Sequence, residues 1–229
     1  MSKVIVTAGP SFEPIDEVRC LTNFSTGDLG VRLANALSRA GFGVFCLKGV
    51  ASTTRTELLG CRELSFTTND DLHRSLVRLA REHRIDAILH VAALCDYKVS
   101  HVTDARGSRQ DAAKIESRAG ELTIALEPAR KVIAGMRAHF PKAVIVGWKY
   151  ELNGTRADAL ARAWRQIREA RTDACVLNGR AWGDGFAFCT PPDQIEELPD
   201  RPALIEFLPR WLEQFKRPGV AVAHGARRR

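Results

Sequence analysis

Short apolar runs alternate with amphipathic segments along most of the chain. Nearly continuous apolar runs, the pattern of strands buried on both faces of a parallel sheet, cover residues 3–9, 43–47, 87–93, 143–147 and 174–177. Apolar residues at steps of three and four, or runs of good helix formers, predict helices over residues 27–40, 71–83, 155–171 and 202–215. This alternation predicts an α/β protein with a Rossmann-like three-layer fold and a mainly parallel sheet.

Weaker signals complete the expected order of elements. Residues 62–66 and 122–126 read as two further strands. Asn69 or Asp70 is expected to cap the helix over 71–83, and Pro128 is expected to begin a helix that runs to Phe140.

Ligands of open parallel sheets bind beyond the carboxyl ends of the strands. A site is therefore expected in the segments that follow the predicted strands, which end at Gly9, Leu47, Ala93, Leu126, Gly147 and Leu177. The polar stretch from Val99 to Ala113 is long, and loops of that length are usually binding flaps or disordered.

Charge is concentrated at one end of the chain. The 229 residues carry a formal net charge of +7, and five basic residues without an acid lie between Lys216 and Arg229. We expect a single domain over residues 1–216, a small C-terminal extension within it, and a disordered basic tail over 217–229. Because the excess charge is not on a folded face with aromatic residues, nucleic-acid binding through the tail is a disfavoured alternative.

Cysteine and histidine spacing predicts no metal site. The six cysteines form no Cys-x-x-Cys unit, and the histidines have no metal-ligand spacing. The chain enters a strand-like run at once, without a signal peptide, and no apolar stretch approaches the ~20 residues that cross a bilayer. These features predict a protein of the reducing cytoplasm.

The first strand–loop–helix differs from a plain dinucleotide site. Its loop of about seventeen residues has no Gly-x-Gly-x-x-Gly, and Lys48 follows the second strand where a ribose-binding acid would stand. An NADP-dependent oxidoreductase remains an alternative, since Lys48 could meet a ribose phosphate. Neither Tyr97 nor Tyr150 has the lysine four residues later that would support it.

The same loop contains groups suited to an acid and a phosphate. Ser25, Thr26 and Gly27 lead into a helix whose first amides could bind phosphate, although a serine or threonine there could simply cap the helix. Arg19 could clamp a carboxylate or phosphate, and Asn23 could donate to a developing oxyanion or make a turn.

Three later positions carry candidate chemistry. Asp96, just after the small residues at 92–93, could accept hydrogen bonds from a base or sugar, bind a metal, or cap a turn. Lys114 follows the long polar loop and could reach a triphosphate, or remain a plain surface lysine. Trp148 could stack on a flat ring, or pack in the core.

Taken together, these segments resemble phosphopantothenate–cysteine ligase, the synthetase part of the coenzyme A biosynthesis flavoprotein family. The similarity runs from about residue 3 to about residue 215. Its longest motif spans Thr7–Asp16 and Val18–Gly27, and the supporting segments follow in order at 92–97, 114–115, 127–128, 146–148, 173–178 and 185–186.

The resemblance implies a two-step reaction. The carboxylate of 4′-phosphopantothenate attacks the α-phosphate of CTP, or of ATP, to give an acyl-nucleotidylate and pyrophosphate. The amine of cysteine then displaces the nucleoside monophosphate, and Mg²⁺ accompanies the nucleotide. The resemblance further implies a homodimer in which the partner closes part of each site, no flavin on this chain, and a separate decarboxylase as a partner.

The resemblance also implies roles for individual residues. Asn23 would hold the acyl-nucleotidylate, with Arg19 beside it. The residues implied to bind the nucleotide are Gly9, Ser11, Ser25, Thr26, Gly27, Ala92, Asp96, Lys114 and Trp148, with Lys114 reaching the phosphates and Trp148 standing where the family often has Phe.

Several positions depart from the family pattern. Gly9–Phe12 reads Gly-Pro-Ser-Phe in place of Gly-Gly-Thr-Arg, and Pro10 lacks a backbone donor. The lysine-rich flap is reduced to Lys114–Ser117, with an acid at Glu116. These changes leave open a second reading, a catalytically weakened nucleotide-binding relative that acts as the partner of a decarboxylase.

Overall fold

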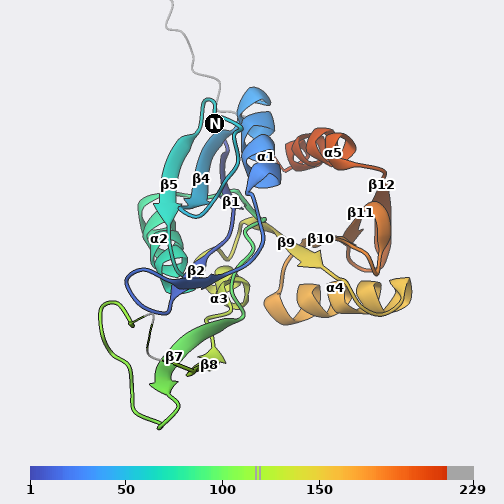
Figure 1. Cartoon of the computed structure of the whole chain (residues 1–229). Coiled ribbons are helices and arrows are strands. Elements are labelled where there is room, and N and C mark those ends of the chain that lie inside the picture. Colours follow the sequence, from blue (N-terminus) through green and yellow to red (C-terminus); the bar gives the residue numbers. More distant parts are fainter. Residues whose placement is uncertain (117, 119, 216–229) are drawn as a thin grey trace, which may run out of the picture.

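An eight-stranded sheet forms the centre of the computed structural model, which describes residues 1–116, 118 and 120–215 (Figure 1). The predicted tail at 217–229 lies outside the described residues. The strand order is β12-β11-β10-β9-β6-β1-β4-β5. The strands are β1 (Lys3–Ala8), β4 (Gly43–Gly49), β5 (Arg62–Phe66), β6 (Ala87–His90), β9 (Val144–Tyr150), β10 (Ala174–Gly179), β11 (Gly183–Thr190) and β12 (Gln194–Leu198).

The sheet confirms the predicted fold class. The six neighbouring strands β10, β9, β6, β1, β4 and β5 pair in parallel. Strands β11 and β12 continue the sheet as antiparallel strands. Strand β1 lies between β4 and β6, so the strand order runs outward in both directions from it. That reversal creates the crevice in which open α/β sheets bind ligands.

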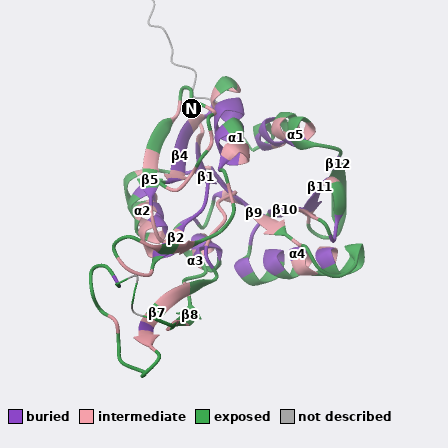
Figure 2. Ribbon diagram, in the orientation of Figure 1, coloured by how far each residue is buried: buried purple, intermediate pink, exposed green. Residues whose placement is uncertain are grey.

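Helices cover both faces of the sheet (Figures 1 and 2). Helices α1 (Asp28–Arg39) and α5 (Arg201–Glu213) pack on the face that presents Val4, Val6 and Leu89. The other face is covered by α2 (Asn69–Glu82), α3 (Val132–His139) and α4 (Arg156–Ala170). Successive residues of β1 enter opposite cores, which explains why the whole strand is apolar.

Two sequence expectations about element boundaries were wrong. Thr68 caps α2, its hydroxyl accepting from the Asp71 N–H, instead of Asn69 or Asp70. Pro128 ends a strand, and α3 begins at Val132. A cap is decided by where the backbone leaves the extended conformation, and a proline fits the end of an edge strand as well as a helix start.

Two hairpins lie outside the main sheet. Strands β2 (Phe12–Pro14) and β3 (Cys20–Thr22) form the first. Strands β7 (Tyr97–Asp104) and β8 (Leu122–Pro128) form the second, which projects away from the sheet in Figure 1. Residues 99–104 are therefore a strand, whereas the sequence indicated a flap or disorder. These strands are short or solvent-exposed, so they lack the continuous apolar pattern of the central strands.

Gly30 brings α1 close to the first strand. A Cβ at Gly30 would lie 2.5 Å from Ala8 Cβ and 3.0 Å from Ala8 Cα. Alanine is favoured over glycine inside a helix by about 1 kcal/mol, but here the helix and β1 would have to separate. We expect Gly30→Ala to lower the free energy of unfolding by about 1–3 kcal/mol, measured by urea denaturation.

Gly135, within α3, provides the matched control. A Cβ there would meet nothing within 4 Å. Gly135→Ala should therefore raise stability by roughly 0.4–1 kcal/mol through helix propensity alone. If both substitutions changed the free energy of unfolding in the same direction, packing of α1 on β1 would not be what decides the effect.

Candidate functional site

The loops that leave β1 and β6 are bonded to each other at the carboxyl edge of the sheet. The Ala93 N–H donates to Gly9 O at 3.0 Å, and the Ser11 N–H donates to Ala93 O at 3.2 Å. Gly9 has a positive φ of 79°, which glycine adopts without strain. Gly9 and Ala92, predicted from separate motifs, thus lie at one place in the fold.

The Ser11 side chain supports this junction. It is fully buried, and its hydroxyl accepts a hydrogen bond from the Cys95 N–H at 2.9 Å. Cys95 is also buried, and burial raises the pKa of its thiol. The Asn69 amide donates to Cys95 O at 2.7 Å and so ties the same loop to the start of α2.

The predicted phosphate-binding turn lies against Gly9. Gly27 precedes α1 with φ 79° and no side-chain cap, and a Cβ on it would come within 3.0 Å of Gly9 Cα. The Ser52 hydroxyl donates to Thr26 O at 2.7 Å and holds this close approach. The start of α1 and the end of β1 therefore form one surface, as expected for an anion site at a helix N-terminus.

An acid occupies the first turn of that helix. Asp28 accepts hydrogen bonds from the hydroxyls of Thr56 at 2.6 Å and Thr54 at 3.1 Å, and it pairs with Arg32 at 2.7 Å. The Thr56 hydroxyl is the largest cause that holds the pKa of Asp28 below its usual value. The charge at the α1 N-terminus is thus already partly balanced by a carboxylate.

Arg19 lies in the turn between β2 and β3, and Asn23 follows β3 on the loop that leads to α1. The Asn23 side chain is exposed, and its Nδ2 donates to Leu94 O at 2.8 Å, which fixes it beside the β6 loop. Arg19 donates from Nη2 to Ile115 O at 2.6 Å, and its Nη1 lies 3.4 Å from Asp16 Oδ2. Both candidates therefore adjoin other predicted site segments. The Arg19 guanidinium, however, contacts groups of this chain, Ile115 and Asp16.

The remaining candidates differ in exposure. Asp96 and Lys114 are exposed, and the Asp96 carbonyl accepts from the Ala129 N–H at 2.9 Å. Trp148 lies on β9, half-buried against the core on the α1 and α5 side of the sheet. Lys48, the residue considered for a ribose phosphate, pairs with Glu63 at 2.7 Å.

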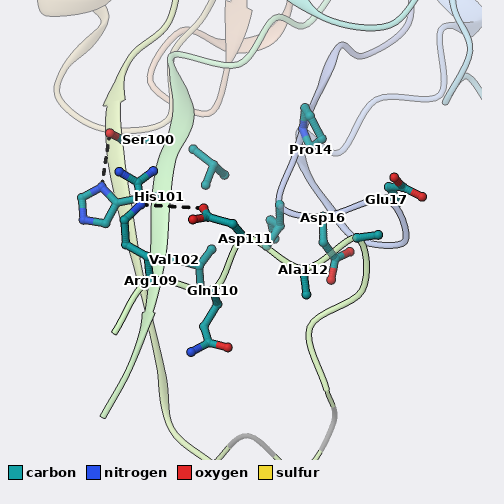
Figure 3. Close-up of a pocket in the computed structure, with 13 residues that line it drawn as sticks. Pro14, Asp16, Glu17, Ser100, His101, Val102, Arg109, Gln110, Asp111 and Ala112 are labelled. Atoms are coloured by element: carbon teal, nitrogen blue, oxygen red, sulfur yellow. Dashed lines mark hydrogen bonds and ion pairs between the residues drawn. The ribbon is translucent and has the colours of Figure 1, made fainter. Parts of the chain in front are cut away.

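A pocket of about 440 Å³ opens at the loop after β2 (Figure 3). It lies between the loop after β2, strand β7 and the segment that returns from the β7 turn. Its lining residues are Pro14, Ile15, Asp16, Glu17, Val99, Ser100, His101, Val102, Arg109, Gln110, Asp111, Ala112 and Ala113. The pocket shares its Asp16 wall with Arg19 but includes none of the predicted nucleotide residues.

Sequence reasoning assigned no role to three polar residues that organise the site. Glu13 and Asp16 belong to the first motif and His90 to a buried strand, and the sequence pattern alone gives none of them a role. Glu13 is buried and accepts from the Asn69 N–H at 3.2 Å, and burial raises the pKa of its carboxyl. The signal that could have found Glu13 and Asp16 is their spacing, because the two acids flank Pro14–Ile15 in a short hairpin.

The described part of the chain holds no group of three or more His, Cys, Asp or Glu residues placed to bind a metal. Within those same residues, no helix is both long enough and apolar enough to span a membrane.

Comparison with known families decides the relationship of this chain. The model of the DNA/pantothenate metabolism flavoprotein C-terminal domain matches residues 1–195. The chain belongs to this family. The resemblance seen in the sequence motifs is thereby confirmed.

Two relatives illustrate the match. A coenzyme A biosynthesis bifunctional protein CoaBC from Thermococcus kodakarensis is 27% identical over 176 residues, which are 77% of this chain and 41% of that protein. A cysteine/cysteine sulfinic acid decarboxylase from an unknown prokaryotic organism is 27% identical over 186 residues, 80% of this chain and 48% of that protein. The chain therefore spans less than half the length of these relatives.

Solved structures confirm the fold. The DNA/pantothenate metabolism flavoprotein from Streptococcus pneumoniae superimposes with a TM-score of 0.83 at 21% identity, over 94% of this chain and all of that one. A Cab2 mutant in complex with phosphopantothenate-cysteine has a TM-score of 0.71 at 18% identity, over 93% of this chain and 86% of that one.

Proposed function

We propose that this chain is a phosphopantothenate–cysteine ligase of coenzyme A biosynthesis. It would activate 4′-phosphopantothenate as an acyl-nucleotidylate and join it to cysteine through a C–N bond. One observation carries the proposal beyond family membership. The loop with Asn23 is hydrogen-bonded to the β6 loop with Ala92 and Asp96, and the neighbouring β2–β3 turn is bonded through Arg19 to the segment with Lys114.

The proposed roles follow from these positions. Asn23 is fixed by one amide hydrogen bond and keeps a second N–H for an acyl or phosphoryl oxygen. The amides at the start of α1 would bind phosphate against Gly9, and Lys114 would add a point charge. Charge-assisted contacts of this kind favour the transition state because the charge on the transferring group builds up there.

The proposed cofactor is Mg²⁺ bound with the nucleotide, CTP or ATP. Asp96 is an exposed carboxylate next to the nucleotide residues, and a Mg²⁺ ion held mostly by phosphates needs only one or two protein carboxylates. The donor set therefore fits such an ion, with Asp96 as the residue that would hold it. When bound, Mg²⁺ would neutralise charge on the phosphates.

We also propose that the chain acts as a homodimer. Large apolar side chains are exposed on the β7–β8 hairpin and beside Asn23. They are Phe24, Tyr97, Ile124 and Leu126. Exposed apolar side chains of this size fit burial against a partner chain.

The second candidate function is a nucleotide-binding partner of a decarboxylase. The similarity to a protein named as a cysteine decarboxylase favours it. So do Asp28 at the start of α1 and Glu116 beside Lys114, because both place negative charge near the proposed phosphates.

Pyrophosphate release tests the proposal. The purified protein is incubated with Mg²⁺, 4′-phosphopantothenate and cysteine, with CTP and with ATP in parallel. We expect release with at least one nucleotide and none when the acid is omitted. Nucleotide binding without any acid-dependent release would instead support the decarboxylase partner.

A further inference from the structure

The segment that carries Lys114 is fastened to the loop after β2. The Glu17 N–H donates to Ala113 O at 2.9 Å, and the Ile115 N–H donates to Asp16 Oδ2 at 3.2 Å. Arg19 donates from Nη2 to Ile115 O at 2.6 Å. These three bonds join segments almost a hundred residues apart, on both sides of Lys114.

Asp16 divides its two carboxylate oxygens between two tasks. Oδ1 accepts from the N–H groups of Val18 at 2.8 Å and Arg19 at 2.7 Å, which holds the local turn. Oδ2 accepts from Ile115 and lies 3.4 Å from Arg19 Nη1. The Asp16 side chain lines the pocket, and its contacts leave only 1% of it exposed.

Ile115 is the anchor of the segment. Its side chain is buried, with 1% of the residue exposed, whereas Lys114 and Glu116 on either side are exposed. The chain thus presents Lys114 to solvent from a backbone that is held at the next residue.

We propose that Asp16 is a positioning residue for Lys114: with Arg19, it holds the backbone at Ile115 so that the lysine is presented to the nucleotide. The structural part stands on the contacts above, and the catalytic part rests on the proposed ligase function. An anchored backbone lowers the entropy that Lys114 would otherwise lose when it binds phosphate.

Asp16→Asn separates the two tasks. Asparagine keeps an acceptor at Oδ1 for the turn but places an NH₂ group where Oδ2 faces the Ile115 N–H and Arg19. In amide hydrogen exchange, we expect Ile115 and Glu17 to exchange roughly tenfold faster or more, because a charge-assisted bond is lost. Val18 and Arg19 should lose much less protection, because the amide oxygen still accepts from their N–H groups, which makes them an internal reference.

A second variant controls for general loss of stability. Asp200 caps α5 by accepting from the Ala203 N–H at 2.8 Å, and asparagine is an equally good cap. Asp200→Asn should change neither the exchange of Ile115 nor pyrophosphate release. Unchanged exchange of Ile115 in Asp16→Asn would overturn the proposal, as would uniform loss of protection across 15–19.

Kinetics test the catalytic part. We expect Asp16→Asn to raise KM for the nucleotide and lower kcat/KM about tenfold or more, with little further loss when Lys114→Ala is added, because both act through the same lysine. A lower kcat with unchanged KM, or full additivity, would reject the positioning role. If the unaltered protein releases no pyrophosphate, the ligase function fails, and the exchange result still decides whether Asp16 holds the segment.

Discussion

Asn23→Ala is expected to slow pyrophosphate release by about 10²–10³-fold, the usual loss when one donor to a developing negative charge is removed. The Asn23 amide already bonds Leu94 O, so its remaining N–H is held in a fixed direction. Alanine removes both the donor and the bond that orients it. Steady-state release with 4′-phosphopantothenate, cysteine and the preferred nucleotide measures the effect.

Asn23→Asp is the matched variant for this prediction. Aspartate has nearly the same shape but no N–H donors, and it would place negative charge against Leu94 O and the phosphates. We expect it to be at least as inactive as Asn23→Ala, while the thermal midpoint of both stays near that of the unaltered protein because the side chain is exposed. Activity retained in Asn23→Ala would remove Asn23 from the mechanism.

Acid is expected to destabilise the protein through His90. This residue is buried at the end of β6, where its Nδ1 lies 2.9 Å from the Thr7 hydroxyl. Burial lowers the pKa of His90 from 6.5 to about 4. Below pH 6.5 the unfolded chain binds a proton that the folded protein excludes, so stability is complete above pH 6.5 and is lost as the pH falls to about 4.

The expected loss is about 3 kcal/mol across that range. Urea denaturation at several pH values between 7.5 and 4 would measure it in the unaltered protein and in His90→Asn. Carboxyl groups such as Asp28 also titrate in acid, but they are common to both proteins, so the difference between the two pH profiles isolates His90. Parallel profiles would show that His90 is not the acid-sensitive group.

His90 also couples stability to the site. Thr7 Oγ1 accepts from the Ala92 N–H at 3.1 Å while it contacts His90. Protonation of His90 would disturb its contact with Thr7. We therefore expect the first structural change in the β6 loop, which contains Ala92 and Asp96.

The sequence by itself determined the six parallel strands of the central sheet and most of the helices, but not the antiparallel strands β11 and β12. Strands buried on both faces, such as β1 and β6, must be apolar along their whole length, and helices such as α1 must repeat their apolar positions at 3.6 residues. The long first motif determined the family, because it extends through a loop whose residues are not constrained by packing alone.

Only the tertiary structure decided how the site residues are used. Ser11 carries a hydroxyl that could bind phosphate, yet this hydroxyl is buried and accepts from the Cys95 N–H. Arg19 suits a clamp for the substrate, yet it holds Ile115 and Asp16. Neighbours that lie seventy to a hundred residues away in the chain fix these roles, and no local pattern encodes them.

The β7–β8 hairpin and the Asp16 contacts to residue 115 have the same origin. An exposed strand is stabilised by its pairing partner and carries little periodic apolar signal, so residues 99–104 read as part of a polar loop. A carboxylate that accepts backbone N–H groups from two separate segments is likewise specified by where those segments meet. The sequence determined the scaffold through burial, and tertiary contacts determined the site through hydrogen bonds between distant loops.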